Sequence, residues 1–287
     1  MIRFSRSART ASVRRARVRS VTGACVSVPT VAAGEARATS FGQVADDYDR
    51  LRPGPPAAAL DWLVPASCQV AVDLGAGTGL FSRALARRVR QVTAVEPDER
   101  MRAVLAARSP GVLAVAGRGE AIPLPDGCAD AVFVSSAWHW LDHEVAVPEV
   151  ARVLRDGGRL GVIWTSRDHR VDWVAELDMG RRRAAAESSG SAADPARPRH
   201  RGHEVTLPGD APFGNAASAS FTFTRSMTVD DAADWLGTYS RVITAPQEER
   251  TAGLAAAREA IARRADENGM VEIPMRSSCW RADRVPR

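Results

Sequence analysis

Lysine is absent from this chain of 287 residues, and all 39 of its basic residues are arginine. Alanine is abundant, so we interpret the missing lysine as a preference for GC-rich codons and not as a chemical requirement. Long apolar runs are also absent, and none approaches the roughly 20 residues that a membrane-spanning helix needs. Hydrophobic residues make up 45% of the chain, which is enough for a substantial core. The sequence therefore predicts a soluble globular protein with no membrane partner.

Cysteine is scarce and scattered. The four cysteines are Cys25, Cys68, Cys128 and Cys279, and no C-x-x-C pair or Cys/His cluster occurs. This spacing indicates neither a zinc site nor a disulfide framework, so we expect no metal. Scattered thiols are typical of a reducing compartment, and we expect a cytoplasmic location.

The net charge of +5 is concentrated at the start of the chain. Residues 1–40 carry eight Arg and one Glu, whereas the other 247 residues carry 31 Arg against 33 Asp and Glu. A nucleic-acid-binding domain needs its basic residues on the folded part, so we expect no nucleic acid partner. We interpret residues 1–40 as a disordered arm, with an organelle transit sequence or translated upstream sequence as alternatives.

The stretch 71–79 reads AVDLGAGTG and is the most informative part of the chain. An apolar strand leads into it, and residues 80–88 then repeat apolar side chains at helical spacing. Gly75, Gly77 and Gly79 allow a tight turn and let a ligand approach the backbone, because no Cβ stands in the way. The free N–H groups of the following helix suit an anionic group. The pattern predicts a ligand-binding turn, although a glycine-rich turn without a ligand fits the same residues.

The spacing of the glycines separates two classes of ligand. A dinucleotide-binding turn has the pattern G-x-G-x-x-G, whose last glycine lets the helix pack on the strand. Here the third glycine comes one residue early, and Leu80 stands where that pattern needs glycine. Asp73 also precedes the turn, where its carboxylate would repel a pyrophosphate but attract a cationic group. The pattern D-x-G-x-G-x-G therefore argues against NAD.

A second acidic residue follows at the expected distance. Residues 91–95 form a short apolar run that ends at Glu96, about 20 residues after Gly75. An acidic residue at this place accepts hydrogen bonds from the hydroxyls of a ribose. Pro97 then ends the strand, and Asp98 is a suitable N-cap for the next helix. The alternative for Glu96 is a solvated charge at a strand end.

Strands and helices alternate from residue 56 to 165, which is typical of an α/β fold with a doubly wound, mostly parallel sheet. Pro148 lies inside the fourth expected helix, where it either kinks that helix or marks its first turn. The four helices are expected at 56–64, 80–89, 98–108 and about 144–154. Seven strands are expected, at 69–74, 91–96, 112–116, 130–135, 159–165, 221–224 and 270–280.

The second half of the chain is less regular. Residues 181–220 are rich in Arg, Ala, Ser, Gly and Pro, and their weak periodicity predicts a long flexible insert. Helices are expected at 229–239 and within 246–268. After the arm 1–40, we therefore divide a single domain, 41–287, into a ligand-binding core, 41–165, a substrate-cover insertion, 166–245, and a closing helix and strand, 246–287.

Four further stretches, together with the glycine turn and Glu96, carry a resemblance to a known protein family. They are residues 41–53 (FGQVADDYDRLRP), 117–125 (GRGEAIPLP), 130–136 (DAVFVSS) and 149–158 (EVARVLRDGG). With these motifs the chain resembles the class I S-adenosylmethionine-dependent methyltransferases, in particular the small-molecule enzymes of the type 11 group. The resemblance is good over about 41–165 and loose afterwards. It implies a Rossmann-like methyltransferase fold, S-adenosyl-L-methionine as cofactor and a small-molecule methyl acceptor.

The resemblance also implies which residues contact the cofactor. Residues 117–125 match the loop that contacts adenine, which often has Asp where this chain has Arg118. Because Arg cannot accept a hydrogen bond, we assign the adenine contact to the backbone at Gly119 and Glu120. Arg52 is either a contact for a carboxylate or a solvated charge. The implied cofactor-binding residues are Tyr48, Asp73, Gly75, Ala76, Gly77, Gly79, Glu96, Pro97, Gly119, Glu120 and Ser135.

The run SSAWHW, residues 135–140, is the candidate catalytic segment. It follows the fourth expected strand and is similar to a run in relatives of trans-aconitate methyltransferase. Trp138 and Trp140 offer an apolar wall or indole faces for the sulfonium, and His139 offers a general base with a pKa near neutrality. Simple packing of these side chains is the alternative. A carboxylate acceptor is already ionised at neutral pH and needs no base.

The main hypothesis is therefore an enzyme that transfers a methyl group to a small molecule, with a weak preference for carboxylate O-methylation. A non-catalytic nucleotide- or metabolite-binding module is the alternative from another class. An NAD-linked oxidoreductase is disfavoured by the early third glycine and by Asp73. RNA methylation through the basic arm would require residues 1–40 for activity.

Overall fold

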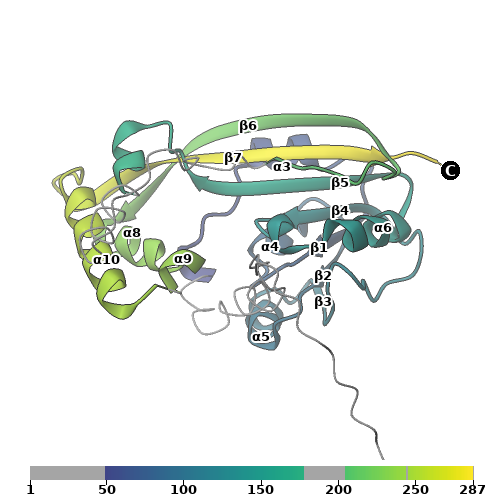
Figure 1. Cartoon of the computed structure of the whole chain (residues 1–287), viewed down its shortest axis with the longest axis horizontal. Helices are drawn as coiled ribbons and strands as arrows, with labels where there is room; N and C mark the ends of the chain where they lie inside the picture. The colour runs from purple at the N-terminus through teal and green to yellow at the C-terminus, as the bar shows by residue number, and fades with distance from the viewer. Residues whose placement is uncertain (1–48, 178–203, 244, 287) are drawn as a thin grey trace, which may run out of the picture.

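The computed structural model describes residues 49–177, 204–243 and 245–286, and the structural statements below concern these residues. They form a seven-stranded sheet with helices packed against it (Figure 1). The order of the strands in the sheet is β3-β2-β1-β4-β5-β7-β6. The strands are β1 Val70–Leu74, β2 Gln91–Val95, β3 Leu113–Val115, β4 Ala129–Ser135, β5 Leu154–Arg167, β6 Phe213–Thr228 and β7 Met270–Arg284.

Most neighbouring strands are parallel. Strands β1 to β5 pair in parallel, whereas β7 is antiparallel to both β5 and β6. This confirms the expected doubly wound, mostly parallel sheet of seven strands. The chain moves outward from β1 through β2 to β3 and then returns to place β4 on the other side of β1. Ligands of open α/β sheets bind at such a reversal, beyond the carboxyl ends of the strands.

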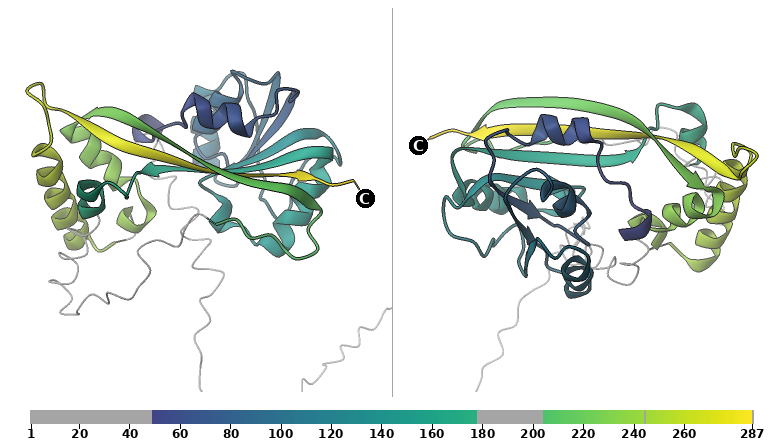
Figure 2. Two further views of the ribbon diagram at one scale, coloured as in Figure 1. Left: turned by 90° about the horizontal axis from the view of Figure 1, so that it is seen from above. Right: turned by 180° about the vertical axis from the view of Figure 1, so that it is seen from behind.

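Strand β4 shows how the sequence builds a core on each face of the sheet. Its residues ADAVFVS are almost all buried, and successive side chains point to opposite faces. Val132 and Val134 pack in one core with α6, whereas Ala131 and Phe133 pack in the other with α3 and α4. Figure 2 shows α3 and α6 on opposite faces. The helices of this half are α3 Ala57–Leu63, α4 Leu80–Leu85, α5 Glu99–Arg108 and α6 His143–Val153, with a 3-10 turn, η2, at Trp138–Trp140.

The C-terminal helices form a third core at one end of the sheet. Helices α8 (Val229–Gly237), α9 (Ser240–Ile243) and α10 (Gln247–Ala262) gather beside the far ends of β6 and β7 (Figure 1). Trp235 on α8, Ile261 on α10 and Ile273 on β7 are buried together there. We call the helices α8 and α9 together, residues 229–243, the cap.

In the second half of the chain, the structure contradicts part of the expected flexible insert and confirms the closing strand. The prediction of a flexible insert is wrong for residues 213–220, which begin the long edge strand β6 and pair with β7. Their small Ala and Ser side chains carry little hydrophobic signal, so the pairing with β7 and not the local sequence determines the strand. Residues 178–203 of the same prediction lie outside the described residues. The closing strand is confirmed and extends to Arg284.

Pro148 lies in the interior of α6 and not in its first turn, since the helix begins at His143. Asp142 caps that helix by accepting the backbone N–H of Glu144. Among the helices that the structure describes, none is both long and apolar enough to cross a membrane.

Candidate active site

The glycine turn between β1 and α4 has a backbone that glycine tolerates best. Gly75, Gly77 and Gly79 have φ angles of +69°, +58° and +83°, all in the left-handed region. The N–H groups of Gly75 and Ala76 both donate to the carbonyl of Val95 at the end of β2. The turn is therefore tied to the neighbouring strand, and its shape is already set in the protein without a ligand.

The three glycines differ in what a Cβ would meet. A Cβ on Gly75 would lie 2.7 Å from the Cβ of Ala137, and one on Gly79 would lie 2.8 Å from Cγ of Leu105. At Gly77 a Cβ would meet nothing within 4 Å. Gly75 and Gly79 are therefore required for packing, whereas Gly77 leaves open space through which a ligand could reach the backbone.

Glu96 links the glycine turn to the start of α5, because each of its carboxylate oxygens accepts one backbone N–H. Oε2 accepts the N–H of Gly77 at 2.8 Å, and Oε1 accepts the N–H of Asp98 at 2.9 Å. The side chain is buried, and burial raises its pKa, although these two hydrogen bonds oppose the shift. Each carboxylate oxygen has a further lone pair, so these bonds leave acceptor capacity for a ribose hydroxyl.

Asp73 lies fully buried behind the turn. Its Oδ2 accepts the hydroxyl of Ser82 at 2.6 Å, whereas Oδ1 is buried without a hydrogen-bond partner. The pKa of Asp73 is raised to about 7, mainly by burial and also by the charge of Glu96, against the opposing hydrogen bonds from Ser82. An unsatisfied buried carboxylate oxygen is costly. A cationic ligand group in front of the turn would offset that cost.

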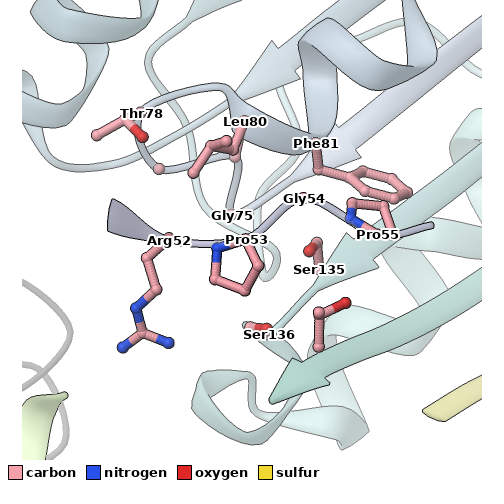
Figure 3. Close-up of a pocket in the computed structure, with 13 residues that line it drawn as sticks. Arg52, Pro53, Gly54, Pro55, Gly75, Thr78, Leu80, Phe81, Ser135 and Ser136 are labelled. Atoms are coloured by element: carbon pink, nitrogen blue, oxygen red, sulfur yellow. The ribbon is translucent and has the colours of Figure 1, made fainter. Parts of the chain in front are cut away.

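A pocket opens in front of the turn. It has about 550 Å³ of space free of protein atoms, part of it open to solvent. Figure 3 shows labelled residues of segments 52–55, 75–81 and 135–136 around this space, and Thr165 of β5 also lines it. The lining residues are Arg52, Pro53, Gly54, Pro55, Gly75, Ala76, Gly77, Thr78, Leu80, Phe81, Ser135, Ser136 and Thr165.

The pocket lies where the topology predicts a ligand, at the carboxyl ends of β1, β4 and β5. Ser136 directly after β4 has a φ of +57°, an uncommon conformation for a residue with a side chain. Thr165 on β5 is fixed by a hydrogen bond of 2.8 Å between its hydroxyl and that of Ser277 on β7. The sequence prediction named Ser135 as a cofactor contact and included Ser136 in the candidate catalytic segment, but it missed Thr165.

Arg52 is one of the lining residues, and its guanidinium is engaged outside the glycine turn. Nε donates to Oγ1 of Thr238 and Nη2 donates to the carbonyl of Thr238, both at 3.1 Å. The guanidinium also lies 4.0 Å from the ring centre of Tyr239. Arg52 is therefore not a solvated charge. It lines the pocket, and its guanidinium also contacts Thr238 and Tyr239. Tyr48, the other predicted residue of this region, lies outside the described residues.

The predicted adenine loop lies beside the site but is absent from the pocket lining in the described part of the chain. Gly119 packs closely under Leu141, since a Cβ there would lie 2.7 Å from Cδ2 of that leucine. Oε1 of Glu120 accepts the N–H of Asp142 at 2.9 Å. Pro97, at the end of β2, has its carbonyl bonded to Arg102. The contacts predicted for these residues stay predictions.

The segment Trp138–Trp140 forms the η2 turn after β4. Trp138 is buried and stacks on His143, with ring centres 4.7 Å apart. His139 is exposed and packs against Trp140, with ring centres 4.5 Å apart; desolvation by its surroundings lowers its pKa. His139 is absent from the pocket lining described above, so its role as a base stays a prediction. The burial of Trp138 matches the alternative for this run, in which its side chains serve packing and not catalysis.

No group of three or more His, Cys, Asp or Glu suited to a metal occurs among residues 49–177, 204–243 and 245–286. Cys68, Cys128 and Cys279 are free thiols, and burial raises the pKa of each.

Comparison with known proteins agrees with this geometry. Residues 72–162 match the sequence profile of a methyltransferase domain family. An uncharacterized methyltransferase of Mycobacterium tuberculosis is 41% identical over 246 residues, which cover 85% of this chain and 95% of that protein. A malonyl-[acyl-carrier protein] O-methyltransferase of Herminiimonas arsenicoxydans is 35% identical over 149 residues, which cover 50% of this chain and 57% of that protein.

A solved structure described as a type II methyltransferase, from Anaeromyxobacter dehalogenans, shares the fold. The TM-score is 0.56 at 24% sequence identity, and the match covers 82% of this chain and 99% of that one. The sheet order, the glycine turn at its switch point and the match to the mycobacterial protein along most of both chains lead to one assignment. The chain belongs to the class I methyltransferases and has their Rossmann-like fold.

Proposed function

We propose that this methyltransferase uses S-adenosyl-L-methionine and transfers its methyl group to a small molecule. The observation that carries the proposal is the open space in front of Gly77, with two buried acidic side chains behind it. The unsatisfied Oδ1 of Asp73 favours a cationic group, and Glu96 retains acceptor capacity for hydroxyls. A ligand with a positive charge and a ribose matches both requirements.

The residues present fit this cofactor. The glycine turn would hold its ribose and methionine portions, with Glu96 at the ribose and Asp73 supplying negative potential behind the turn. When bound, the cofactor supplies an electrophilic methyl group on a sulfonium. The task of the chain is then to exclude water and to place an acceptor in line with that methyl group, near Ser135 and Ser136.

The acceptor class we favour is a carboxylate, as the sequence resemblance suggested. The relative in Herminiimonas arsenicoxydans is named for O-methylation of a malonyl group, which ends in a carboxylate. A carboxylate needs no deprotonation at neutral pH. His139 is the candidate base for an acceptor that must lose a proton, and its position beyond the pocket lining favours an acceptor that does not. We also propose a cytoplasmic location, which rests on the cysteine pattern alone.

Calorimetry with S-adenosylhomocysteine tests the cofactor assignment. We expect saturable binding to the full chain and its loss in Gly77→Val, whose side chain would occupy the open space. Gly127→Ala is a matched control, because Gly127 also has a positive φ, +60°, and open space around it but does not line the pocket. Absence of binding, or equal binding in Gly77→Val, would overturn the proposal.

Incubation with methyl-labelled cofactor and a cell metabolite extract tests the acceptor. A labelled carboxylic ester is the expected product, whereas a labelled amine or carbon centre would refute the carboxylate assignment. Binding of the cofactor without any labelled product would favour the alternative of a non-catalytic metabolite-binding module. A titration with NAD distinguishes the oxidoreductase alternative.

A further inference from the structure

A short segment of the chain covers the pocket from outside the sheet. We call residues 49–55 the strap. Four of its members, Arg52 to Pro55, line the pocket opposite the glycine turn (Figure 3). Pro53 and Pro55 restrict its backbone, so the strap changes shape mainly by moving as a unit.

One end of the strap is bound to the cofactor half of the molecule. The carboxylate of Asp49 accepts Nη2 of Arg83 at 2.6 Å and Nη1 of Arg108 at 2.7 Å. Burial raises the pKa of Asp49, but the hydrogen bonds from Arg83 and Arg108 outweigh burial and hold it below its usual value. These contacts connect the strap to α4 and α5, the helices that follow the glycine turn and Glu96.

The middle of the strap is bound to the C-terminal end of the molecule. Leu51 is buried in the third core with Trp235, and its carbonyl accepts Nη1 of Arg225 at 2.6 Å. Arg52 reaches further, to Thr238 and Tyr239 between α8 and α9, by the two hydrogen bonds and the ring contact described above. Figure 2 shows the first residues of the strap beside these helices, far from α3.

Arg52 is therefore a wall of the pocket and a contact of the cap at the same time. We propose that Arg52 is a positioning residue that couples occupancy of the cofactor pocket to the rigidity of the cap, residues 229–243. This inference rests on the proposed use of S-adenosyl-L-methionine. It makes the cap, and not only the glycine turn and the β-strands, responsive to cofactor binding.

The physical basis is the fork of the guanidinium. Two hydrogen bonds to one residue fix the plane of Arg52 over Tyr239, and the ring contact adds a cation–π attraction. A ligand that packs against the pocket face of the strap restricts Arg52, and this restriction passes to Thr238. Coupling of this kind is reciprocal in binding free energy, so an ordered cap must also raise the affinity for the cofactor.

Hydrogen exchange of the full chain with and without S-adenosylhomocysteine tests the coupling. In the wild type we expect the ligand to slow amide exchange both in residues 75–79 and in the cap, the latter by about fivefold or more. In Arg52→Met the protection of residues 75–79 should persist while the protection of the cap is lost. Thr238→Val removes the acceptor Oγ1 and also the hydrogen bond that this hydroxyl donates to the carbonyl of Trp235 within the cap. Its readout is therefore the change in cap exchange caused by the ligand, which should be smaller than in the wild type.

Arg50→Met is the matched control. Arg50 is an arginine of the same strap that pairs with Asp231 on α8 at 2.6 Å but does not line the pocket. In Arg50→Met we expect the ligand to slow amide exchange in the cap as much as it does in the wild type. The inference is overturned if the ligand leaves exchange in the wild-type cap unchanged, or if Arg52→Met protects the cap as well as Arg50→Met does. If the proposed function itself is wrong, S-adenosylhomocysteine will slow amide exchange neither in residues 75–79 nor in the cap, which distinguishes that failure from failure of the coupling.

Discussion

The carboxylate of Glu96 accepts the backbone N–H of Gly77 at 2.8 Å, although the two residues belong to different βα units. This bond fixes the turn residue that has open space around it, and it comes from the side chain predicted to contact a ribose. One carboxylate thus fixes the turn and is also the predicted contact of the ligand's ribose. Substitutions of Glu96 should therefore affect the turn and the ligand together.

Glu96→Gln should weaken binding of S-adenosylhomocysteine by about 10- to 100-fold, since a hydrogen bond to a charged group contributes roughly 1.5–3 kcal/mol. The amide has one accepting oxygen for two N–H donors, those of Gly77 and Asp98, and its NH₂ group would face one of them. Calorimetry measures the change. Glu99→Gln, on an exposed residue of α5, is the control and should bind as the wild type does.

Gly77→Ala and Gly79→Ala should separate binding from stability. Both positions have a positive φ, so each alanine costs about 1–2 kcal/mol of backbone strain. The Cβ at Gly79 would also collide with Leu105 and Ser109, which adds about 1–3 kcal/mol of overpacking. We expect urea unfolding to show the larger loss for Gly79→Ala, and calorimetry to show the larger loss of binding for Gly77→Ala. The opposite order would mean that Gly77 is not the residue the ligand approaches.

The glycine turn was predictable because its information is local. Three glycines, a preceding acid and a following helix are adjacent in sequence, and each has one dominant physical reading. The doubly wound, mostly parallel sheet followed from the alternation of strands and helices, whereas the order of its strands was not predicted. The same local signals placed Ser135 at the pocket, since it directly follows a strongly apolar strand.

Other parts of the site depend on contacts between distant residues and leave no local signal. Thr165 is fixed by Ser277, and Arg52 is held by Thr238, which lies 186 residues further along the chain. The first half of β6 is built from Ala and Ser, whose pattern resembles a linker until pairing with β7 is known. Asp73 was predicted to face a ligand, and only the fold shows that it acts from a buried position behind the turn.

The burial of Asp73 predicts a pH dependence of cofactor binding. Its pKa is raised to about 7 by burial, with a further contribution from the charge of Glu96. A cationic ligand favours the ionised form, so binding below that pH releases a proton. The affinity for S-adenosylhomocysteine should therefore rise as the pH increases toward about 7 and level off above it. Calorimetry in buffers with different ionisation enthalpies counts the released proton, and Asp73→Asn should abolish the release.

The stability of the free protein should change in the opposite sense. A carboxyl whose pKa is raised by folding binds more protons in the folded state than in the unfolded state, where its pKa is about 4. The contribution of Asp73 is therefore greatest at low pH and is lost as the pH rises from about 4 through about 7. The difference in unfolding free energy between the wild type and Asp73→Asn should follow this slope. A flat difference across that range would show that Asp73 is not the titrating group.

His139→Gln tests whether the acceptor must lose a proton. For the carboxylate that we favour, kcat should fall by no more than about threefold, because no general base is needed. An acceptor that needs deprotonation predicts a loss of about 100-fold or more and the disappearance of the acidic limb of the pH–rate profile. That limb would lie below the ordinary pKa of histidine, since desolvation lowers the pKa of His139. The assay uses the acceptor identified with labelled cofactor, and Trp140→Phe controls for the packing of the neighbouring ring.

Asp130 is a structural carboxylate at the opposite end of the sheet from the pocket. Its Oδ2 accepts the N–H groups of Gln69 and Val70, at 2.6 Å and 3.0 Å, and Oδ1 pairs with Arg155 at 2.5 Å. Asp130→Ala would leave two backbone donors at the start of β1 unsatisfied, so we expect a loss of about 2–4 kcal/mol in urea unfolding.

Asp130→Asn keeps an accepting oxygen for both backbone donors and loses only the pair with Arg155, whose side chain is half exposed. We therefore expect it to cost about 1 kcal/mol. Asp126→Ala, which removes an exposed partner of Arg152, is the control and should change the unfolding free energy by less than about 0.5 kcal/mol. Equal losses in Asp130→Ala and Asp130→Asn would mean that the ion pair, and not the capping of the strand, accounts for the stabilisation by Asp130.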